Sequence, residues 1–171
     1  MSRLRLVWCA GLSIAALGLA PLAARSPILL WNASASAPIG LYRLDGTVRV
    51  GLGDQTAWRP PAPWADWFDA RGYVPVGVPL IKTVAAVTPS VVCRDGDRLT
   101  IDGRPAALAR RRDTAGRPLP RWQGCVRLGP DDVLILSLGV PDALDGRYFG
   151  LVSRGDLMGR VTPIRVWGRG E

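Results

Sequence analysis

Hydrophobic residues form one long run near the start of the chain and short runs elsewhere. Positions 6–24 carry no charged residue, and arginines flank them on both sides. A helix of that length would span about 28 Å, which is close to the thickness of a hydrocarbon core. The pattern predicts a cytoplasmic tip at residues 1–5, a transmembrane anchor at residues 6–25 and an external domain at residues 26–171.

A cleavable signal peptide is the competing interpretation of this run, because the small residues before Arg25 resemble the end of such a peptide. Pro21 disfavours cleavage after Ala20, and the bulky Leu22 disfavours the site that would release Arg25. An uncleaved anchor is therefore favoured. Because arginines precede the run, we expect the amino terminus to stay in the cytoplasm and the following domain to lie outside.

Beyond this run, short apolar stretches separated by Gly, Pro and Asp predict strands joined by tight turns. A β-hairpin is predicted from strands 91–94 and 97–101 around the Asp95-Gly96 turn, and Asp102-Gly103 ends it with a second turn. Two further buried strands are predicted at 133–136 and 148–152. An edge strand that contains Pro163 is predicted at 161–166, and one short helix at 64–71.

Composition agrees with a mainly β fold in a single packed domain. Of the 171 residues 48% are hydrophobic, and the 20 Gly and 15 Pro suit short strands better than long helices. The chain contains no histidine. This absence excludes a Ser-His-Asp or Cys-His catalytic unit and the usual histidine-bearing zinc site, so we expect no metal.

The net charge of +8 brings nucleic-acid binding into consideration. The cations form a run only at Arg110, Arg111 and Arg112, and zinc-finger or basic-zipper spacings are missing. We interpret the charge as a solvated surface and expect no nucleic-acid partner.

Lys82 is the single lysine in the chain, and every other cation is arginine. Arginine stays protonated, whereas a buried lysine can lose its proton and act as a base. A strand over residues 78–87 would place Leu80, Lys82 and Val84 on one face. The alternative is an edge strand whose lysine extends into water.

Ser36 is the candidate nucleophile that such a base could activate. It lies in the sequence NASASAPIGLYR at residues 32–43, where small residues followed by Pro and Gly predict an exposed turn that another chain can approach. A plain linker is the alternative for this stretch.

Cys93 and Cys125 form an even pair in the predicted external domain, while Cys9 lies in the apolar run. Both lie on predicted strands near turns, so a disulfide between them is favoured over two ordinary buried thiols.

Four stretches together resemble the TraF-type conjugative-transfer signal peptidases, which belong to the leader-peptidase group of Ser-Lys proteases. They are SAPIGLYR from Ser36, the apolar strand that carries Lys82, DTAGRPLP from Asp113, and DGRYFG from Asp145. The motifs occur in the family's order and cover the chain from the anchor to Trp167. The resemblance implies a leader-peptidase-like β catalytic domain with one N-terminal transmembrane helix.

The resemblance also implies roles for individual residues. Ser36 would be the nucleophile and Lys82 the general base, while the Ser34 hydroxyl and the Ser36 backbone N–H would bind the oxyanion. Asp145 and Arg147 would support the site structurally. Relatives often carry a serine where this chain has Ala143, so Lys82 would need another orienting group, either a main-chain carbonyl or Ser137.

The resemblance further implies a serine endopeptidase of the bacterial inner membrane that crosses it once and has its catalytic domain in the periplasm. Its substrate would be an exported pilin-like precursor with small residues beside the cleaved bond, processed by hydrolysis or cyclisation without a cofactor. The alternative is a non-catalytic, membrane-anchored scaffold of a conjugation or secretion system.

Overall fold

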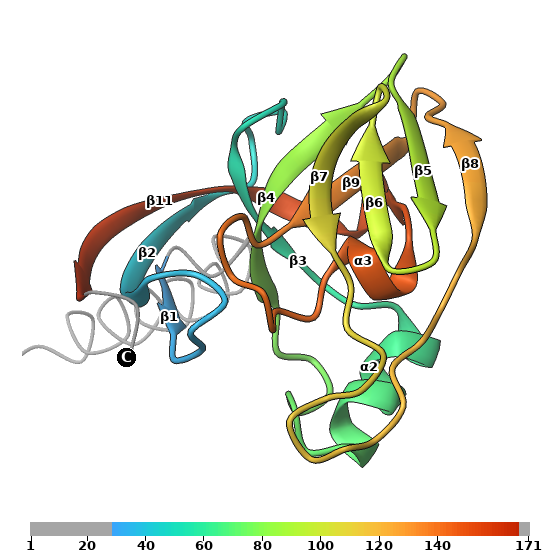
Figure 1. Cartoon of the computed structure of the whole chain (residues 1–171). Helices are drawn as coiled ribbons and strands as arrows, with labels where there is room; N and C mark the ends of the chain where they lie inside the picture. The colour runs from blue at the N-terminus through green and yellow to red at the C-terminus, as the bar shows by residue number, and fades with distance from the viewer. Residues whose placement is uncertain (1–28, 168–171) are drawn as a thin grey trace, which may run out of the picture.

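Two antiparallel sheets make up most of the computed structural model, which describes residues 29–167 (Figure 1). The first sheet has seven strands in the order β1 (Leu29–Asn32), β2 (Ile39–Asp45), β11 (Leu157–Trp167), β3 (Gln55–Trp58), β4 (Leu80–Val87), β9 (Asp132–Leu136) and β10 (Val152–Ser153). The second has four, in the order β7 (Arg104–Leu108), β6 (Arg98–Ile101), β5 (Val91–Asp95) and β8 (Gly124–Arg127). The mainly β fold class is thereby confirmed.

The predicted tip at residues 1–5 and anchor at residues 6–25 lie outside the described residues. Within residues 29–167, the helices are too short or too polar to cross a bilayer. The helices there are α2 (Ala62–Ala70), α3 (Gly146–Phe149) and a short 3₁₀ turn at Arg154–Asp156. Helix α2 corresponds to the helix predicted at 64–71.

The predicted hairpin is confirmed as strands β5 and β6, with its turn displaced by one position. Asp95 pairs with Arg98, so Gly96 and Asp97 form the loop. The second turn is at Asp102-Gly103, as predicted, between β6 and β7. Both of its residues have positive φ, 49° and 75°, which is the requirement of a two-residue type I′ turn.

The strand predicted at 148–152 is wrong in most of its length. Residues Gly146–Phe149 form α3, and only Val152 of the predicted range enters a strand. The reason is local: the side chain of Asp145 accepts a hydrogen bond from the Arg147 N–H and caps the helix. This capping outweighs the apolar pattern of the sequence.

The strand predicted at 161–166 exists, and among the described strands this stretch pairs on one side only, as an edge strand does. It belongs to β11, which lies between β2 and β3. The pairing with β3 ends at Arg160, and the pairing with β2 shifts register between Pro163 and Arg165. Proline is tolerated there because this half of β11 pairs with β2 alone among the described strands.

Helix α3 packs directly on β9, and a glycine permits this contact. A Cβ at Gly146 would lie 2.6 Å from Leu134 Cδ1 and 2.9 Å from the Ile135 carbonyl oxygen, closer than atoms can approach. Substitution of Gly146 would therefore displace α3, and with it the neighbouring Asp145. The main apolar cluster surrounds Trp58, whose ring stacks on Phe149 with centroids 4.6 Å apart.

Candidate active site

Lys82 is buried in the middle of the seven-stranded sheet. Strand β4, which carries it, pairs with β3 on one side and β9 on the other, and Lys82 is only 2% exposed. Leu80 and Val84 are buried as well, as the predicted strand face requires. The alternative of an edge strand with a lysine that reaches into water is wrong.

Burial gives Lys82 a pKa that suits a base. The pKa of Lys82 is lowered from 10.5 to about 8, mainly because loss of hydration disfavours the ammonium form. The negative charge of Asp145 opposes this shift, and the positive charge of Arg147 adds to it. The Nζ atom donates a hydrogen bond of 2.9 Å to Oγ of Ser137, the residue directly after β9. Of the two orienting groups considered from the sequence, the structure places Ser137 beside the lysine.

Asp145 and Arg147 form hydrogen bonds that support Ser137 and the loop after β9. One oxygen of the fully buried Asp145 accepts a 2.8 Å hydrogen bond from the Ser137 N–H. Arg147 donates to both carboxylate oxygens, at 2.8 and 2.7 Å, and to the carbonyls of Val140 and Pro141, at 2.8 and 3.0 Å. These contacts join the loop after β9 to α3 and hold Ser137 against the lysine.

The segment that carries Ser36 is the connection between the antiparallel strands β1 and β2, so the linker interpretation is wrong. Asn32, 8% exposed, organises this connection. Its Nδ2 donates to the carbonyls of Ser34, Ala37 and Pro38 at 2.9, 3.1 and 3.0 Å, and its Oδ1 accepts from the Ser34 N–H at 3.2 Å.

The direction of the hydrogen bonds follows from this arrangement. Three carbonyl oxygens around Nδ2 define the orientation of the Asn32 amide, since only the nitrogen can donate to them. The Ser34 hydroxyl has one proton and donates it to Asn32 Oδ1 at 3.0 Å. The 2.9 Å bond between the two serine hydroxyls must therefore use the proton of Ser36.

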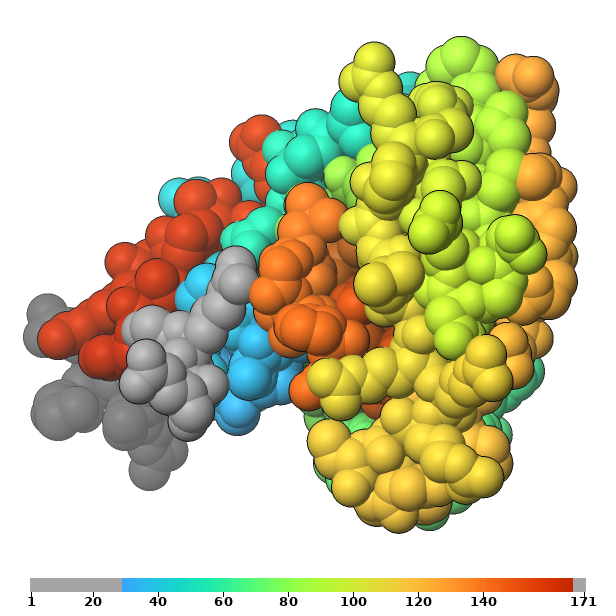
Figure 2. Space-filling view, viewed as in Figure 1, coloured from blue at the N-terminus to red at the C-terminus, as the bar shows by residue number. Residues whose placement is uncertain are grey.

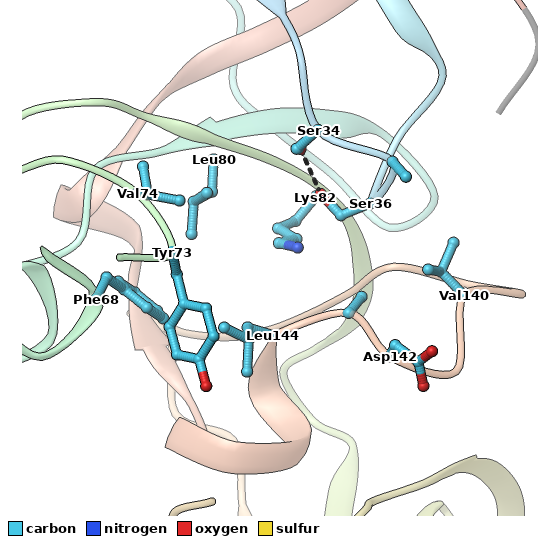
Figure 3. Close-up of a pocket in the computed structure, with 12 residues that line it drawn as sticks. Ser34, Ser36, Phe68, Tyr73, Val74, Leu80, Lys82, Val140, Asp142 and Leu144 are labelled. Atoms are coloured by element: carbon cyan, nitrogen blue, oxygen red, sulfur yellow. Dashed lines mark hydrogen bonds between the residues drawn. The ribbon is translucent and has the colours of Figure 1, made fainter. Parts of the chain in front are cut away.

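Ser34, Ser36 and Lys82 line the same pocket, which has a volume of about 240 Å³. Figure 3 shows the three residues together, with Phe68 and Tyr73 across the pocket from them. The rest of the lining is mostly apolar and consists of Ala35, Val74, Leu80, Val140, Asp142, Ala143 and Leu144. Asp145 and Arg147 are not among the lining residues and reach the lysine through Ser137.

The disulfide predicted between Cys93 and Cys125 is present, with an S–S distance of 2.09 Å. The two residues face each other across β5 and β8, in the second sheet. Within residues 29–167, acidic and cysteine side chains do not gather into a group that could hold a metal ion.

Sequence reasoning did not assign roles to Asn32, which organises the Ser36 loop, or to Tyr73, which lines the pocket. Asn32 carried a usable signal, because a short amide just before a turn commonly bonds the backbone of the following residues. Tyr73 carried no such signal in the sequence. It follows a helix end, and Asp113, which accepts its hydrogen bond, lies 40 positions away. The motif that begins at Asp113 supported the resemblance without receiving a role.

Comparison with known proteins assigns the chain to a family. Residues 3–167 match the family described as signal peptidase, peptidase S26. The chain belongs to this signal peptidase family. It is therefore a member of a serine peptidase family, and the resemblance stated from its motifs is confirmed.

Relatives of this signal peptidase family member include two plasmid transfer proteins TraF from Escherichia coli. One is 31% identical over 146 residues, and the other 31% identical over 147 residues; each alignment covers 80% of this chain and 82% of the relative. A solved signal peptidase I from Enterococcus faecalis is also similar, at 18% identity and a TM-score of 0.40, over 67% of this chain and 98% of that one.

Proposed function

We propose that this chain is a membrane-anchored serine endopeptidase that processes an exported precursor with Ser36 as nucleophile and Lys82 as general base. The observation that carries the proposal is the position of Lys82. It is a buried lysine whose pKa is lowered to about 8, and it lines the pocket that Ser36 also lines. A neutral amine beside a serine hydroxyl can activate that hydroxyl without histidine.

The proposed reaction is acyl transfer. In the resting arrangement the Ser36 proton points to Ser34, so it turns toward Lys82 when substrate binds. Lys82 takes this proton as Ser36 Oγ bonds to the scissile carbonyl carbon, and it returns the proton to the departing amine as the C–N bond breaks. The product of this stage is an acyl-enzyme.

Ser34 is the proposed oxyanion donor, together with the Ser36 backbone N–H, and its proton turns from Asn32 Oδ1 to the oxyanion as that charge develops. Its hydroxyl lies 2.9 Å from the nucleophile, on the loop that Asn32 organises. In the second stage the neutral Lys82 takes a proton from water, whose oxygen bonds to the acyl carbon, and returns that proton to Ser36 Oγ as the ester bond breaks. If the amino terminus of the substrate attacks instead, the product is a ring.

The proposed substrate is a pilin-like precursor with small residues beside the cleaved bond. The names of the two relatives, plasmid transfer proteins, support a role in transfer, and the small apolar pocket supports small side chains. We place the protein in the bacterial inner membrane with residues 6–25 as the anchor and the catalytic domain in the periplasm. An anchor would confine enzyme and membrane-inserted precursor to one surface and so raise their effective concentration.

The test is intact-mass spectrometry of a pilin precursor co-expressed with the enzyme. Wild type should shorten the precursor, and Ser36→Ala, Lys82→Ala and Lys82→Arg should leave it intact, since arginine cannot lose its proton. Ser90→Ala, a serine outside the pocket, is the control and should process normally. A further loss of one water from the linear product would indicate cyclisation.

Normal processing by Lys82→Arg would exclude Lys82 as the base. A precursor that stays intact with wild type, for every transfer-system precursor tested, would favour the non-catalytic scaffold.

A further inference from the structure

A second and larger cavity adjoins the pocket that holds Ser36 and Lys82. It has a volume of about 510 Å³ and shares Ala35, Tyr73, Asp142 and Leu144 with the first pocket. Its other lining residues include charged side chains, among them Arg110, Arg112 and Asp113. Tyr73 therefore stands between an apolar pocket and a charged one, opposite Ser36 in Figure 3.

The backbone of Tyr73 is held by the end of helix α2. Gly72, with φ of +68°, donates its N–H to the Asp69 carbonyl at 2.8 Å, and the Tyr73 N–H donates to the Phe68 carbonyl at 3.0 Å. This pair of bonds is the Schellman motif, in which glycine provides the left-handed residue. The Tyr73 side chain thus leaves the helix end in a defined direction, beside Phe68 in the same pocket.

The ring of Tyr73 is held at its far end as well. Its hydroxyl donates a short hydrogen bond to Oδ2 of Asp113, and the same oxygen accepts from Arg117 Nε at 2.7 Å. The Arg117 guanidinium also lies over the ring, with Cζ 5.0 Å from the centroid. Asp113 and Arg117 together restrict rotation of the tyrosine side chain.

The two clamping residues are themselves fixed. The other oxygen of Asp113 accepts from the N–H groups of Ala115 and Arg117, at 2.9 and 2.8 Å. Arg117 also donates to the Arg71 carbonyl at 3.0 Å, and Arg71 donates to the Pro118 carbonyl at 2.9 Å. The segment between β7 and β8 passes around α2 in Figure 1 and forms the lower protrusion in Figure 2.

We propose that Tyr73 limits the size of the substrate side chain that the apolar pocket accepts, and that Asp113 and Arg117 are the residues that position it. This inference rests on the proposed peptidase function. A ring held at its backbone and at its hydroxyl cannot swing aside for a larger side chain. Its removal would join the pocket of about 240 Å³ to the cavity of about 510 Å³.

The test compares kcat/KM for peptides that differ only in the residue on the acyl side of the cleaved bond, alanine or leucine. Wild type should prefer alanine. Tyr73→Ala should raise the leucine-to-alanine ratio by roughly tenfold or more, the range expected when a pocket gains room for extra methylene groups. An unchanged ratio in a folded Tyr73→Ala variant would overturn the inference.

Two conservative variants test the clamp without removing the ring. Tyr73→Phe deletes only the hydroxyl. Asp113→Asn keeps one oxygen for the turn N–H groups but replaces the other with an amino group, which cannot accept from Tyr73 or Arg117. Each should raise the leucine-to-alanine ratio several-fold, less than Tyr73→Ala does. Wild-type ratios in both variants would overturn the positioning role of Asp113.

Asp66→Asn, on the exposed face of α2, is the matched control and should keep the wild-type ratio. Circular dichroism checks that each variant is folded. Failure of wild type to cleave the alanine peptide in a Ser36-dependent manner would overturn the proposed function, and this inference with it. Cleavage with equal ratios in wild type and all three variants would overturn this inference alone.

Discussion

Lys82 Nζ donates a hydrogen bond of 2.9 Å to Oγ of Ser137, and both residues are almost completely buried. The backbone N–H of Ser137 is in turn bonded to the buried Asp145 carboxylate at 2.8 Å. A lysine side chain has several rotatable bonds, so this fixed acceptor determines where its nitrogen lies. The Ser36-bearing loop then needs only to present its hydroxyl to a nitrogen already in place.

Ser137→Ala should lower kcat by roughly 10- to 100-fold with little change in KM, because Lys82 would lose its orienting partner. The pH midpoint of the activity should also move to lower pH, since a hydroxyl that accepts from the ammonium form favours that form and its loss lowers the pKa of Lys82 further. Steady-state kinetics across pH measures both effects. A merely structural Ser137 would leave the midpoint unchanged, and Ser90→Ala serves as the control.

Processing should rise with pH and reach half its maximum near the pKa of Lys82, about 8. The reason is that only the neutral amine can accept the Ser36 proton. Single-turnover rates between about pH 6 and pH 10, buffered at constant ionic strength, provide the measurement. A rate that falls as the pH rises through this range would contradict the assignment of Lys82 as base.

The same lowered pKa predicts a dependence of stability on pH that does not involve catalysis. Between its lowered pKa, about 8, and its ordinary value, 10.5, Lys82 binds more protons in the unfolded chain than in the folded one. The free energy of unfolding should therefore fall by about 3 kcal/mol as the pH drops through this window and should fall no further below it. Lys82→Met should abolish this difference, and urea unfolding of both proteins at a series of pH values measures it.

Asn32→Asp should lower kcat by roughly 100-fold. The substitution keeps an oxygen that can accept from Ser34 but replaces Nδ2 with an oxygen that faces the carbonyls of Ser34, Ala37 and Pro38. The carbonyls of Ser34 and Ala37 would then lack this donor, and that of Pro38 would keep only its bond from Tyr42. Each buried group left unsatisfied costs about 1 to 3 kcal/mol. Kinetics and thermal unfolding would show the loss, and Gln123→Glu, on an exposed amide, is the control. Activity equal to wild type would show that Asn32 does not position the loop.

Replacement of Cys93 and Cys125 by serine should lower the free energy of unfolding by about 3 to 4 kcal/mol, the chain-entropy value for a loop of this length. The bridge spans 32 positions of sequence and joins β5 to β8. Neither cysteine lines the pocket, so kcat should stay near the wild-type value under conditions where the variant is folded. Urea unfolding without reductant measures the change, and an equal midpoint for both proteins would contradict it.

Local patterns in the sequence were sufficient for the parts of the molecule that depend on neighbouring residues. The β5–β6 hairpin followed from its turn residues, and the buried face of β4 followed from the alternation around Lys82. The pairing of the cysteines followed from their number and their strands. Where two local signals competed, the sequence did not show which element would form. The apolar residues at 148–152 predicted a strand, whereas the helix cap at Asp145 produced α3.

The single lysine and the absence of histidine, both visible in the sequence, were enough by themselves to limit the proposed base to a neutral amine. Only the tertiary structure decided which hydroxyl orients that amine, because Ser137 is separated from Lys82 by 55 positions and reaches it through the pairing of β9 with β4. The tertiary structure alone also placed Tyr73 against Asp113 and enclosed the pocket. Burial lowers the pKa of a lysine and fixes its partners, and burial is a property of the packed chain rather than of any one segment of it.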